Sequence, residues 1–318
     1  MKILSTAMLH ASILLAILGA GCGGTGEPGA DVLPSDTPPD ESMVARVPYR
    51  VLCFNVMCSA CGSPADEPWD ARVAHFGDLF ARLQPDLVGL QELIVGDEVD
   101  QVLAVAPGFA ASYFPGNDDF IPYPDAAVLY RTDRFQEIET GWYWLSPTPD
   151  TAGSLGFSPG QILPRVVAWV HLKDRVHATD LYFATTHFDS THPQQENSAP
   201  LVIERTAPWA ARMPVIQTGD FNTEPRDPAF QVLTRGVDAT GFRFEDAFAL
   251  APGWHVESDA EPPPPYDPTN RIDHVLVAGG DWTATDWFVD LHRYGPDRRF
   301  PSDHRAVMAV LELALPPR

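Results

Sequence analysis

Short runs of apolar and β-branched residues, separated by turns, make up most of the chain from about residue 49 to residue 315. Runs of this length bounded by Pro, Gly or Asp are typical of β-strands. The runs that predict strands are residues 49–57, 86–92, 126–131, 135–145, 165–173, 180–188, 214–221, 272–278, 283–290 and 305–313. Many strands with few helices favour one large domain with two sheets.

Two segments carry apolar residues at helical spacing. Residues 70–83 place Leu79 and Leu83 on one face, and residues 198–213 have a less regular apolar face. We therefore expect helices over both segments. The proline-rich stretch at 261–268 predicts an extended loop.

Polar residues that can ligate a metal or move a proton stand at the ends of the apolar runs. These residues are Asn55, Glu92, His187, Asp220, Asn222, Asp273, Asp303 and His304. Side chains from the ends of different strands can converge on one cleft. Each residue alone also fits a turn, a solvated strand end or a buried histidine, but together they predict a catalytic site.

The chain is strongly acidic, with 43 Asp and Glu against 21 Lys and Arg and a formal net charge of −22. Its only lysines are Lys2 and Lys173. This balance argues against a broad basic surface that binds nucleic-acid backbones. It does not exclude local groups of arginines. Solubility alone also explains the acidity.

The apolar run at residues 8–21 is too short to span a bilayer and predicts the core of a signal peptide. It ends in small residues directly before Cys22, which resembles the bacterial lipoprotein processing site. That resemblance implies a signal peptide over residues 1–22 and lipid modification of Cys22. Because Gly19 departs from the usual leucine, secretion with cleavage nearby is the alternative.

Residues 23–47 are rich in Gly, Pro, Ser and acids and poor in large apolar residues. This composition predicts a flexible tether. The remaining residues, 48–318, then form the folded domain. We expect an exported protein anchored by lipid to the bacterial cell envelope, at the outer membrane or surface, or else a secreted or periplasmic one.

The ordered motifs FNVM, LQE, TTHFD, GDFN, RIDH and SDHR resemble the endonuclease/exonuclease/phosphatase superfamily. The resemblance runs from about residue 50 to residue 312 and rests most strongly on GDFN followed by SDHR. It implies an α+β fold, the four-layer α/β/β/α sandwich of DNase I-like proteins. The segments at 142–150 and 165–172 resemble a largely uncharacterised bacterial branch.

The resemblance also implies roles for the polar residues. Glu92 and Asn55 match the family's metal ligands, and Asp303 could reach a metal as well. Because almost all candidate ligands are oxygens, Mg²⁺ is the expected ion, with Mn²⁺ as an alternative. His304 matches the family's essential histidine, with Asp273 as its partner.

Three further residues have implied roles in the chemistry. Asp220 competes with His304 for the task of orienting or deprotonating water, and Asn222 would contact the phosphate. His187 would hydrogen-bond a phosphate oxygen or the leaving group. Arg131 and Arg165 are the basic residues that we expect nearest the cleft, with a structural ion pair as the alternative for each.

The cysteines Cys58 and Cys61 form a CSAC segment just after the first strand. In an exported protein this spacing favours a local disulfide over free thiols or zinc, since no second ligand pair accompanies it. Cys53 is expected to be a buried strand residue.

We therefore expect a Mg²⁺-dependent phosphoesterase at the cell envelope, acting on a small organic phosphate or a phosphodiester headgroup. The alternative is a surface nuclease of DNase I type, which the net charge weakly disfavours. A third hypothesis is a catalytically inactive binding module, against which the full series of polar residues argues. We expect a monomer whose partners are the phosphate ester and, through Cys22, the membrane.

Overall fold

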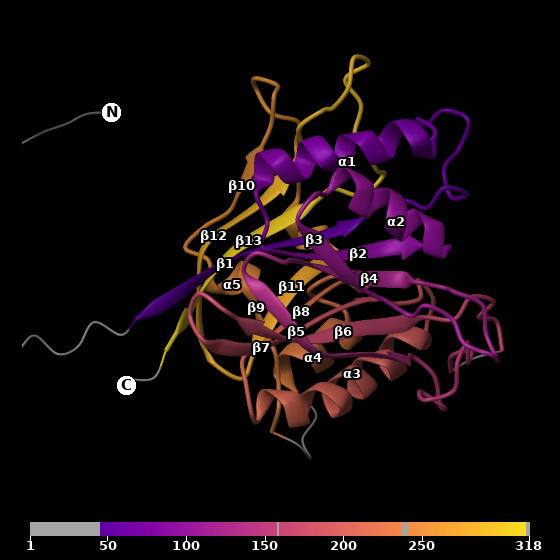
Figure 1. Ribbon diagram of the computed structural model, residues 1–318, viewed down its shortest axis with the longest axis vertical. Helices are drawn as coiled ribbons and strands as arrows, with labels where there is room; N and C mark the ends of the chain where they lie inside the picture. Colours follow the sequence, from indigo (N-terminus) through magenta and orange to yellow (C-terminus); the bar gives the residue numbers. More distant parts are fainter. Residues whose placement is uncertain (1–44, 158, 237–240, 316–318) are drawn as a thin grey trace, which may run out of the picture. The chain divides into compact units, whose positions relative to one another are not determined.

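The computed structural model describes residues 45–157, 159–236 and 241–315 (Figure 1). Within these residues the strands form two mixed sheets. The first contains, in spatial order, β10 (His255–Glu257), β12 (Asp281–Asp290), β13 (Val307–Ala314), β1 (Arg46–Asn55), β2 (Leu87–Leu93), β4 (Asp125–Arg131) and β3 (Phe109–Ser112). The second contains β5 (Phe135–Trp144), β6 (Val166–Asp174), β7 (Thr179–His187), β8 (Val215–Asp220), β11 (Asp273–Ala278) and β9 (Glu245–Asp246).

Helices cover the outer face of each sheet (Figure 1). On the first sheet lie α1 (Trp69–Leu83) and α2 (Gly96–Val105), and on the second lie α3 (Gln194–Ala210) and α4 (Pro228–Arg235). The short helices α5 (Ala247–Leu250) and η1 (Pro268–Asn270) follow α4. The described residues thus form the four-layer α/β/β/α sandwich that the sequence predicted.

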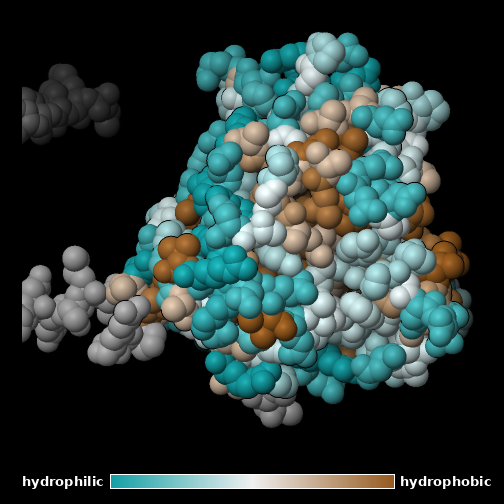
Figure 2. All heavy atoms as spheres, in the orientation of Figure 1, coloured by the Kyte–Doolittle hydropathy of each residue, from teal (hydrophilic) through white to brown (hydrophobic). Residues whose placement is uncertain are grey.

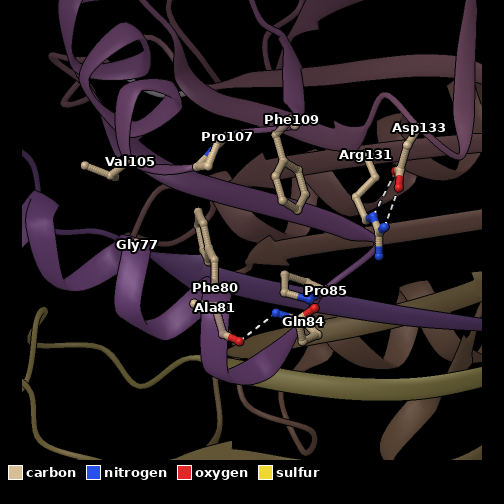
Figure 3. A pocket seen from close by; sticks show the side chains of 12 residues that line it. Gly77, Phe80, Ala81, Gln84, Pro85, Val105, Pro107, Phe109, Arg131 and Asp133 are labelled. Carbon is tan, nitrogen blue, oxygen red and sulfur yellow. Dashed lines mark hydrogen bonds and ion pairs between the residues drawn. The ribbon is translucent and has the colours of Figure 1, made fainter.

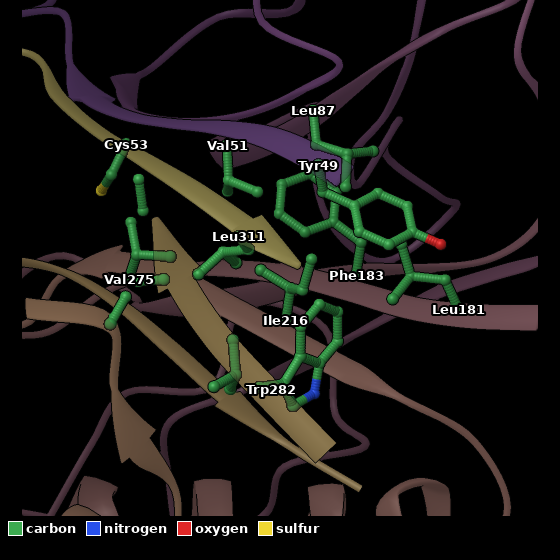
Figure 4. Packing of buried hydrophobic residues seen from close by; sticks show 14 of the residues in the cluster. Tyr49, Val51, Cys53, Leu87, Leu181, Phe183, Ile216, Val275, Trp282 and Leu311 are labelled. Atoms are coloured by element: carbon green, nitrogen blue, oxygen red, sulfur yellow. The ribbon is translucent and has the colours of Figure 1, made fainter. Parts of the chain in front are cut away.

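The alternation of side chains along β1 explains why this strand can bury both of its faces. Val51 and Cys53 point into the core between the sheets, whereas Leu52 and Phe54 pack with the helices α1 and α2. Figure 4 shows Val51 and Cys53 in the inner core together with Ile216 from the second sheet. A strand buried on both faces carries a nearly continuous apolar run, as β1 does.

All the predicted strands are present, with small shifts at their ends. The first predicted helix is α1, and the second is α3, which begins and ends earlier than the predicted range of 198–213. The reason is that the buried face of α3 opens with the polar residues Gln194 and Gln195, which carry no apolar signal. Helices α2 and α4 and the shortest strands were not predicted, because each is too short to show a clear period.

Strand β1 begins at Arg46, where it pairs with Ala314 of β13. The end of the predicted tether, residues 46 and 47, therefore belongs to the first sheet, and the predicted boundary at residue 48 is slightly late. The predicted signal peptide, Cys22 and residues 23–44 of the tether lie outside the described residues. In the part of the chain that the structure describes, no helix is long and apolar enough to cross a membrane.

Cys58 and Cys61 form the disulfide that the sequence predicted. Cys53 is a free thiol with no exposed surface, also as predicted. Burial raises the pKa of the Cys53 thiol well above its usual value, so this residue is a small apolar component of the core.

Candidate active site

The directions of the strands bring the predicted polar residues to one edge of the sandwich. In the first sheet β1 and β2 are parallel, so both end at this edge. In the second sheet β7 and β8 are parallel and β11 is antiparallel to them, and the register places Asp220 beside both His187 and Asp273. Strands β4, β6 and β13 run antiparallel to their neighbours and present their first residues at the same edge.

Glu92 occupies an irregular position at the end of β2. Its neighbours Gln91 and Leu93 pair with consecutive residues of β4, which leaves Glu92 as the extra residue of a bulge. Its φ of 65° lies in the left-handed region, which is uncommon for a residue with a side chain. Bulges commonly re-aim a side chain next to a functional site, and here the carboxylate points toward the end of β1.

A hydrogen-bonded group of three residues joins the two sheets at this edge. Asn55 Nδ2 donates to Glu92 Oε1 at 3.1 Å and to Asp220 Oδ2 at 3.0 Å. The backbone N–H of Met57 donates to Asn55 Oδ1 at 3.0 Å and fixes the orientation of the amide. Because Asn55 and Asp220 are buried, the two carboxylates are held in place by the amide between them.

His304 lies on the other side of Asp220 with a carboxylate behind it. Its Nδ1 is 2.9 Å from Asp273 Oδ2, and its Nε2 is 3.6 Å from Asp220 Oδ2. Burial alone would lower the pKa of His304, but the carboxylates of Asp273 and Asp220 outweigh it and raise the pKa. Burial raises the pKa of Asp273, partly offset by the positive charge of His304. The pair therefore holds its proton tightly.

His187 approaches Asp220 from the opposite direction and has a carboxylate partner of its own. Its Nε2 is 3.7 Å from Asp220 Oδ2, and its Nδ1 is 3.1 Å from Asp125 Oδ1. Arg165 Nη1 lies 2.7 Å from the same Nδ1 and 3.3 Å from Asp125 Oδ1, so Asp125 and Arg165 together hold this side of the imidazole. Burial lowers the pKa of Arg165, but Asp125 and other nearby anions raise it overall, so the guanidinium stays charged.

Asp125 is a site residue that the sequence interpretation missed. Its side chain is buried, and its φ of 37° marks an unusual backbone conformation at the start of β4. The sequence signal was an acid directly before the apolar run at 126–131, of the same kind as Asp273 before its own strand. Two histidines, each backed by an aspartate, thus converge on Asp220.

We expect Asp125→Asn to lower kcat on a phosphate ester by about 10- to 100-fold, because the neutral amide loses the ion pair with Arg165 and no longer holds Arg165 and the His187 ring in place as the carboxylate does. Steady-state kinetics with the best substrate of a phosphate-ester screen would measure this effect. The control is Asp133→Asn, an exposed acid just beyond the other end of β4, which should keep its rate. If Asp125→Asn and Asp133→Asn had the same kcat, Asp125 would have no role in catalysis.

Asn222 and Asp303 lie beside the site. The backbone N–H of Asn222 donates to Asp220 Oδ1 at 2.9 Å, and its side chain donates to the carbonyl of Phe188. Asp303 is exposed next to His304. Ser302 ties this loop to the end of β1, since its hydroxyl donates to the carbonyl of Asn55 at 2.7 Å and accepts from the N–H of His304 at 3.1 Å.

The donor atoms of this site fit a divalent cation. Candidate ligand atoms of Asp220, Asp273 and His304 lie within 4.8 Å of one another. Asp273 Oδ1 is buried and has no hydrogen-bond partner among the described residues, so it is free to bind an ion. Glu92 adds a further carboxylate, the kind of oxygen ligand that hard cations prefer. Asn55, a predicted ligand, instead turns its Nδ2 toward the carboxylates of Glu92 and Asp220 and its Oδ1 toward the N–H of Met57, so it positions these carboxylates.

Arg131 lies away from the site, so the prediction that it borders the cleft is wrong. It pairs with Asp133 at 2.5 Å (Figure 3). It also lies 3.9 Å from Asp86. Since β4 is antiparallel to β2, its first residue, Asp125, reaches the site and its last residue, Arg131, is roughly 20 Å away along the strand. Arg165 stands directly before β6, which is antiparallel to β7 and begins at the site edge. Of the two predicted arginines, Arg165 is therefore the one that reaches the site.

Arg131 instead lines a surface hollow of about 500 Å³ beneath α1 and α2, together with Phe80 and Phe109 (Figure 3). In Figure 2 a hydrophobic strip crosses this region of an otherwise largely hydrophilic face. Among the described residues that line this hollow there is no histidine, and Asp133, the acid that pairs with Arg131, is the one acid.

Arg72 of α1 is a second residue that the sequence interpretation missed. Its guanidinium is buried and donates five hydrogen bonds, all to backbone carbonyls. The acceptors are Glu67, Val56, Met57, Cys58 and Pro301, at 2.6–3.3 Å. Arg72 therefore joins the loop after Asn55 to the loop before His304. The sequence signal was an arginine at helical spacing among the apolar residues Trp69, Phe76 and Leu79.

Comparisons with known proteins agree with this geometry. The sequence model of the Endonuclease/Exonuclease/phosphatase family matches residues 52–304. A search of curated protein sequences finds no match.

Several solved structures share the fold. An endonuclease/exonuclease/phosphatase family protein from Bacteroides thetaiotaomicron is 25% identical, with a TM-score of 0.71 over 85% of this chain and 100% of that one. A mannosyl-6-phosphatase from Bacteroides thetaiotaomicron VPI-5482 is 25% identical, with a TM-score of 0.69 over 83% and 99%. The human Nocturnin catalytic domain, 18% identical with a TM-score of 0.61 over 85% and 96%, shares the fold.

Proposed function

We propose, from the premise that this chain belongs to the endonuclease/exonuclease/phosphatase family, that it is a Mg²⁺-dependent phosphoesterase acting on a small organic phosphate or a phosphodiester headgroup. Family membership makes the protein a metal-dependent hydrolase of phosphate ester bonds. The ion, the substrate and the location are our proposals, and Mn²⁺ is the alternative ion.

The observation that carries this proposal is the convergence of His187 and His304 on Asp220, with Glu92 and Asn55 alongside. Glu92, Asp220 and the free oxygen of Asp273 would hold the ion, and Asn55 would keep the first two in position. Asp303, whose charge acts on His304, is a further candidate ligand. A bound divalent cation would neutralise charge on the phosphoryl oxygens and help to generate the nucleophile from water.

The residues of the chain account for the remaining requirements. Asp273 holds His304 so that its Nε2 faces the reacting group, and Asp125 holds His187 in the same way. The two Nε2 atoms can then donate hydrogen bonds to phosphoryl oxygens or to the leaving group. Asp220 Oδ2, between the two imidazoles, can accept a proton from a water. Because the carboxylates around His304 raise its pKa and keep it protonated, this arrangement favours Asp220 over His304 as the base.

Two observations support a small phosphate ester as the substrate. The formal net charge of −22 opposes a long polyanion, although a few arginines can act locally. The 25% identity to a mannosyl-6-phosphatase supports sugar phosphates in particular. The test is a screen of the purified protein with Mg²⁺ against sugar phosphates, inositol phosphates, sphingomyelin, DNA and RNA. Turnover of DNA or RNA alone would replace this proposal by the nuclease alternative.

We expect excess EDTA to abolish the activity found in this screen and added Mg²⁺ or Mn²⁺ to restore it, because the carboxylates of Glu92, Asp220 and Asp273 repel a phosphate unless a cation lies between them. The measurement is initial rate against free metal concentration. The control is the same protein dialysed without chelator. A rate that persists in excess EDTA would contradict the metal mechanism.

We also propose that the protein is exported, held at the cell envelope by lipid on Cys22, and monomeric. The apolar run before Cys22 and the tether composition support this placement. Detergent-phase partitioning of the wild type and of Cys22→Ser would test it, because only the lipidated protein should enter the detergent phase. Recovery of both proteins in the aqueous phase would indicate secretion without an anchor.

A further inference from the structure

The loop between β12 and β13 gathers arginines beside the active site. Residues 291–306 contain Arg293, Arg298, Arg299 and Arg305, a dense group in a chain with 21 basic residues and a net charge of −22. These four line a surface hollow of about 520 Å³. The hollow also includes Asp303, the exposed acid next to His304, so it adjoins the predicted reaction site.

Two of these arginines, Arg293 and Arg305, form no ion pair with an acid in the described part of the chain. The guanidinium groups of Arg293 and Arg305 lie 5.3 Å and 3.7 Å from the centre of the Phe300 ring. Among the described residues neither makes an ion pair, whereas Arg298 pairs with Asp259 and Arg299 donates to the carbonyl of Ala65.

The hydrogen bonds of these two side chains leave several donors free. Arg305 Nη1 donates to the carbonyls of Ser302, Asp303 and His304, while its Nε and Nη2 have no partner among the described residues. The guanidinium of Arg293 donates no hydrogen bond to the described part of the chain. Both side chains are only half-exposed, so their charges are partly desolvated.

Two of the three acids that line the same hollow are engaged elsewhere, and the third, exposed Asp303, acts on Arg305 and on His304 by its charge without forming an ion pair with either. Asp66 accepts from the backbone N–H and the hydroxyl of Ser63, and Glu67 lies 3.3 Å from His75. Two neighbouring guanidinium groups around one aromatic ring repel each other unless an anion lies between them. A phosphate group satisfies this arrangement best, because it accepts from both planar forks at once.

We propose that Arg293 and Arg305 form a second phosphate-binding site, which holds a phosphate of the substrate other than the one that is cleaved. This inference rests on the proposed function and narrows it: the substrate is a phosphate ester with a second phosphate. That chemistry occurs in a bisphosphorylated sugar and in a short oligonucleotide. The overall negative charge of the protein then acts against anions in general, while this site selects those with two phosphates.

The test is a binding experiment that needs no catalysis. Purified protein is titrated calorimetrically with inorganic phosphate in excess EDTA, where the acidic reaction site repels the anion. We expect saturable binding to the wild type, about tenfold weaker binding to Arg293→Met and none to Arg293→Glu. Arg46→Met, which removes an exposed arginine at the start of β1, is the control and should bind as the wild type does.

The same titration distinguishes the two sources of the second phosphate. The affinities of fructose 1,6-bisphosphate and of a thymidine tetranucleotide are compared with that of inorganic phosphate. The ligand that belongs to the substrate class should bind the wild type more tightly than phosphate does. In Arg293→Met its affinity should fall to that of phosphate. The proposal is overturned if the wild type shows no saturable phosphate binding, if both Arg293 variants bind normally, or if neither ligand binds better than phosphate. These binding results do not depend on hydrolysis. The proposed phosphoesterase activity and the proposed second phosphate site can therefore fail independently of each other.

Discussion

Replacing His304 with alanine should lower kcat on any phosphate ester that the protein hydrolyses by about a thousandfold. The imidazole is held by Asp273 at 2.9 Å and faces Asp220 at 3.6 Å, a position from which no other described side chain can replace its Nε2. Since the expected loss is in the chemical step, kcat should fall much more than KM changes.

The design of this experiment must separate lost chemistry from lost structure. The His304 side chain is 18% exposed, so the fold should survive its removal, and thermal unfolding should stay within about 6 °C of the wild type. Added imidazole should restore part of the rate, which a collapsed site would not allow. His255→Ala is the matched control, because His255 also pairs with an acid but lies on β10 with a 46% exposed side chain. A near-normal rate for His304→Ala would reject the proposed site.

The sequence was sufficient to predict most of the fold and most of the site, because the signals for both are local. The buried strands carry continuous apolar runs, and the reactive residues interrupt these runs where each strand meets the edge. The sequence pattern did not contain the direction in which each strand runs relative to its neighbours. Strands β1, β2, β7 and β8 present their ends at the edge, whereas β4, β6, β11 and β13 present their starts.

Strand direction explains both the error at Arg131 and the omission of Asp125. The two residues lie at opposite ends of β4, and only its pairing with β2 decides which end reaches the site. The contact between Asp125 and His187 joins residues 62 positions apart in different sheets, so no local pattern contains it. Arg72 was missed for a different reason, since its five acceptors are backbone carbonyls and leave no trace in side-chain composition.

Replacing Arg72 with methionine should lower the free energy of unfolding by about 3 kcal/mol, and the melting temperature by about 6–12 °C. Methionine fills a similar volume but leaves five carbonyls without their donor, four of them in the two loops that carry Asn55 and His304. Chemical denaturation and thermal unfolding would measure the loss. Arg212→Met, at an exposed arginine beside Trp209, is the control and should change stability by less than about 1 kcal/mol.

Arg72→Lys separates the charge of this residue from its geometry. A lysine ammonium keeps the charge near Asp303 but has three donors on one atom, so it cannot reach carbonyls on both loops as the guanidinium fork does. We therefore expect Arg72→Lys to recover only part of the stability and to keep a reduced kcat, because Asn55 and His304 lose their common support. Full recovery of kcat by lysine would show that the charge matters and the link between the loops does not. Unchanged stability in Arg72→Met would refute both roles.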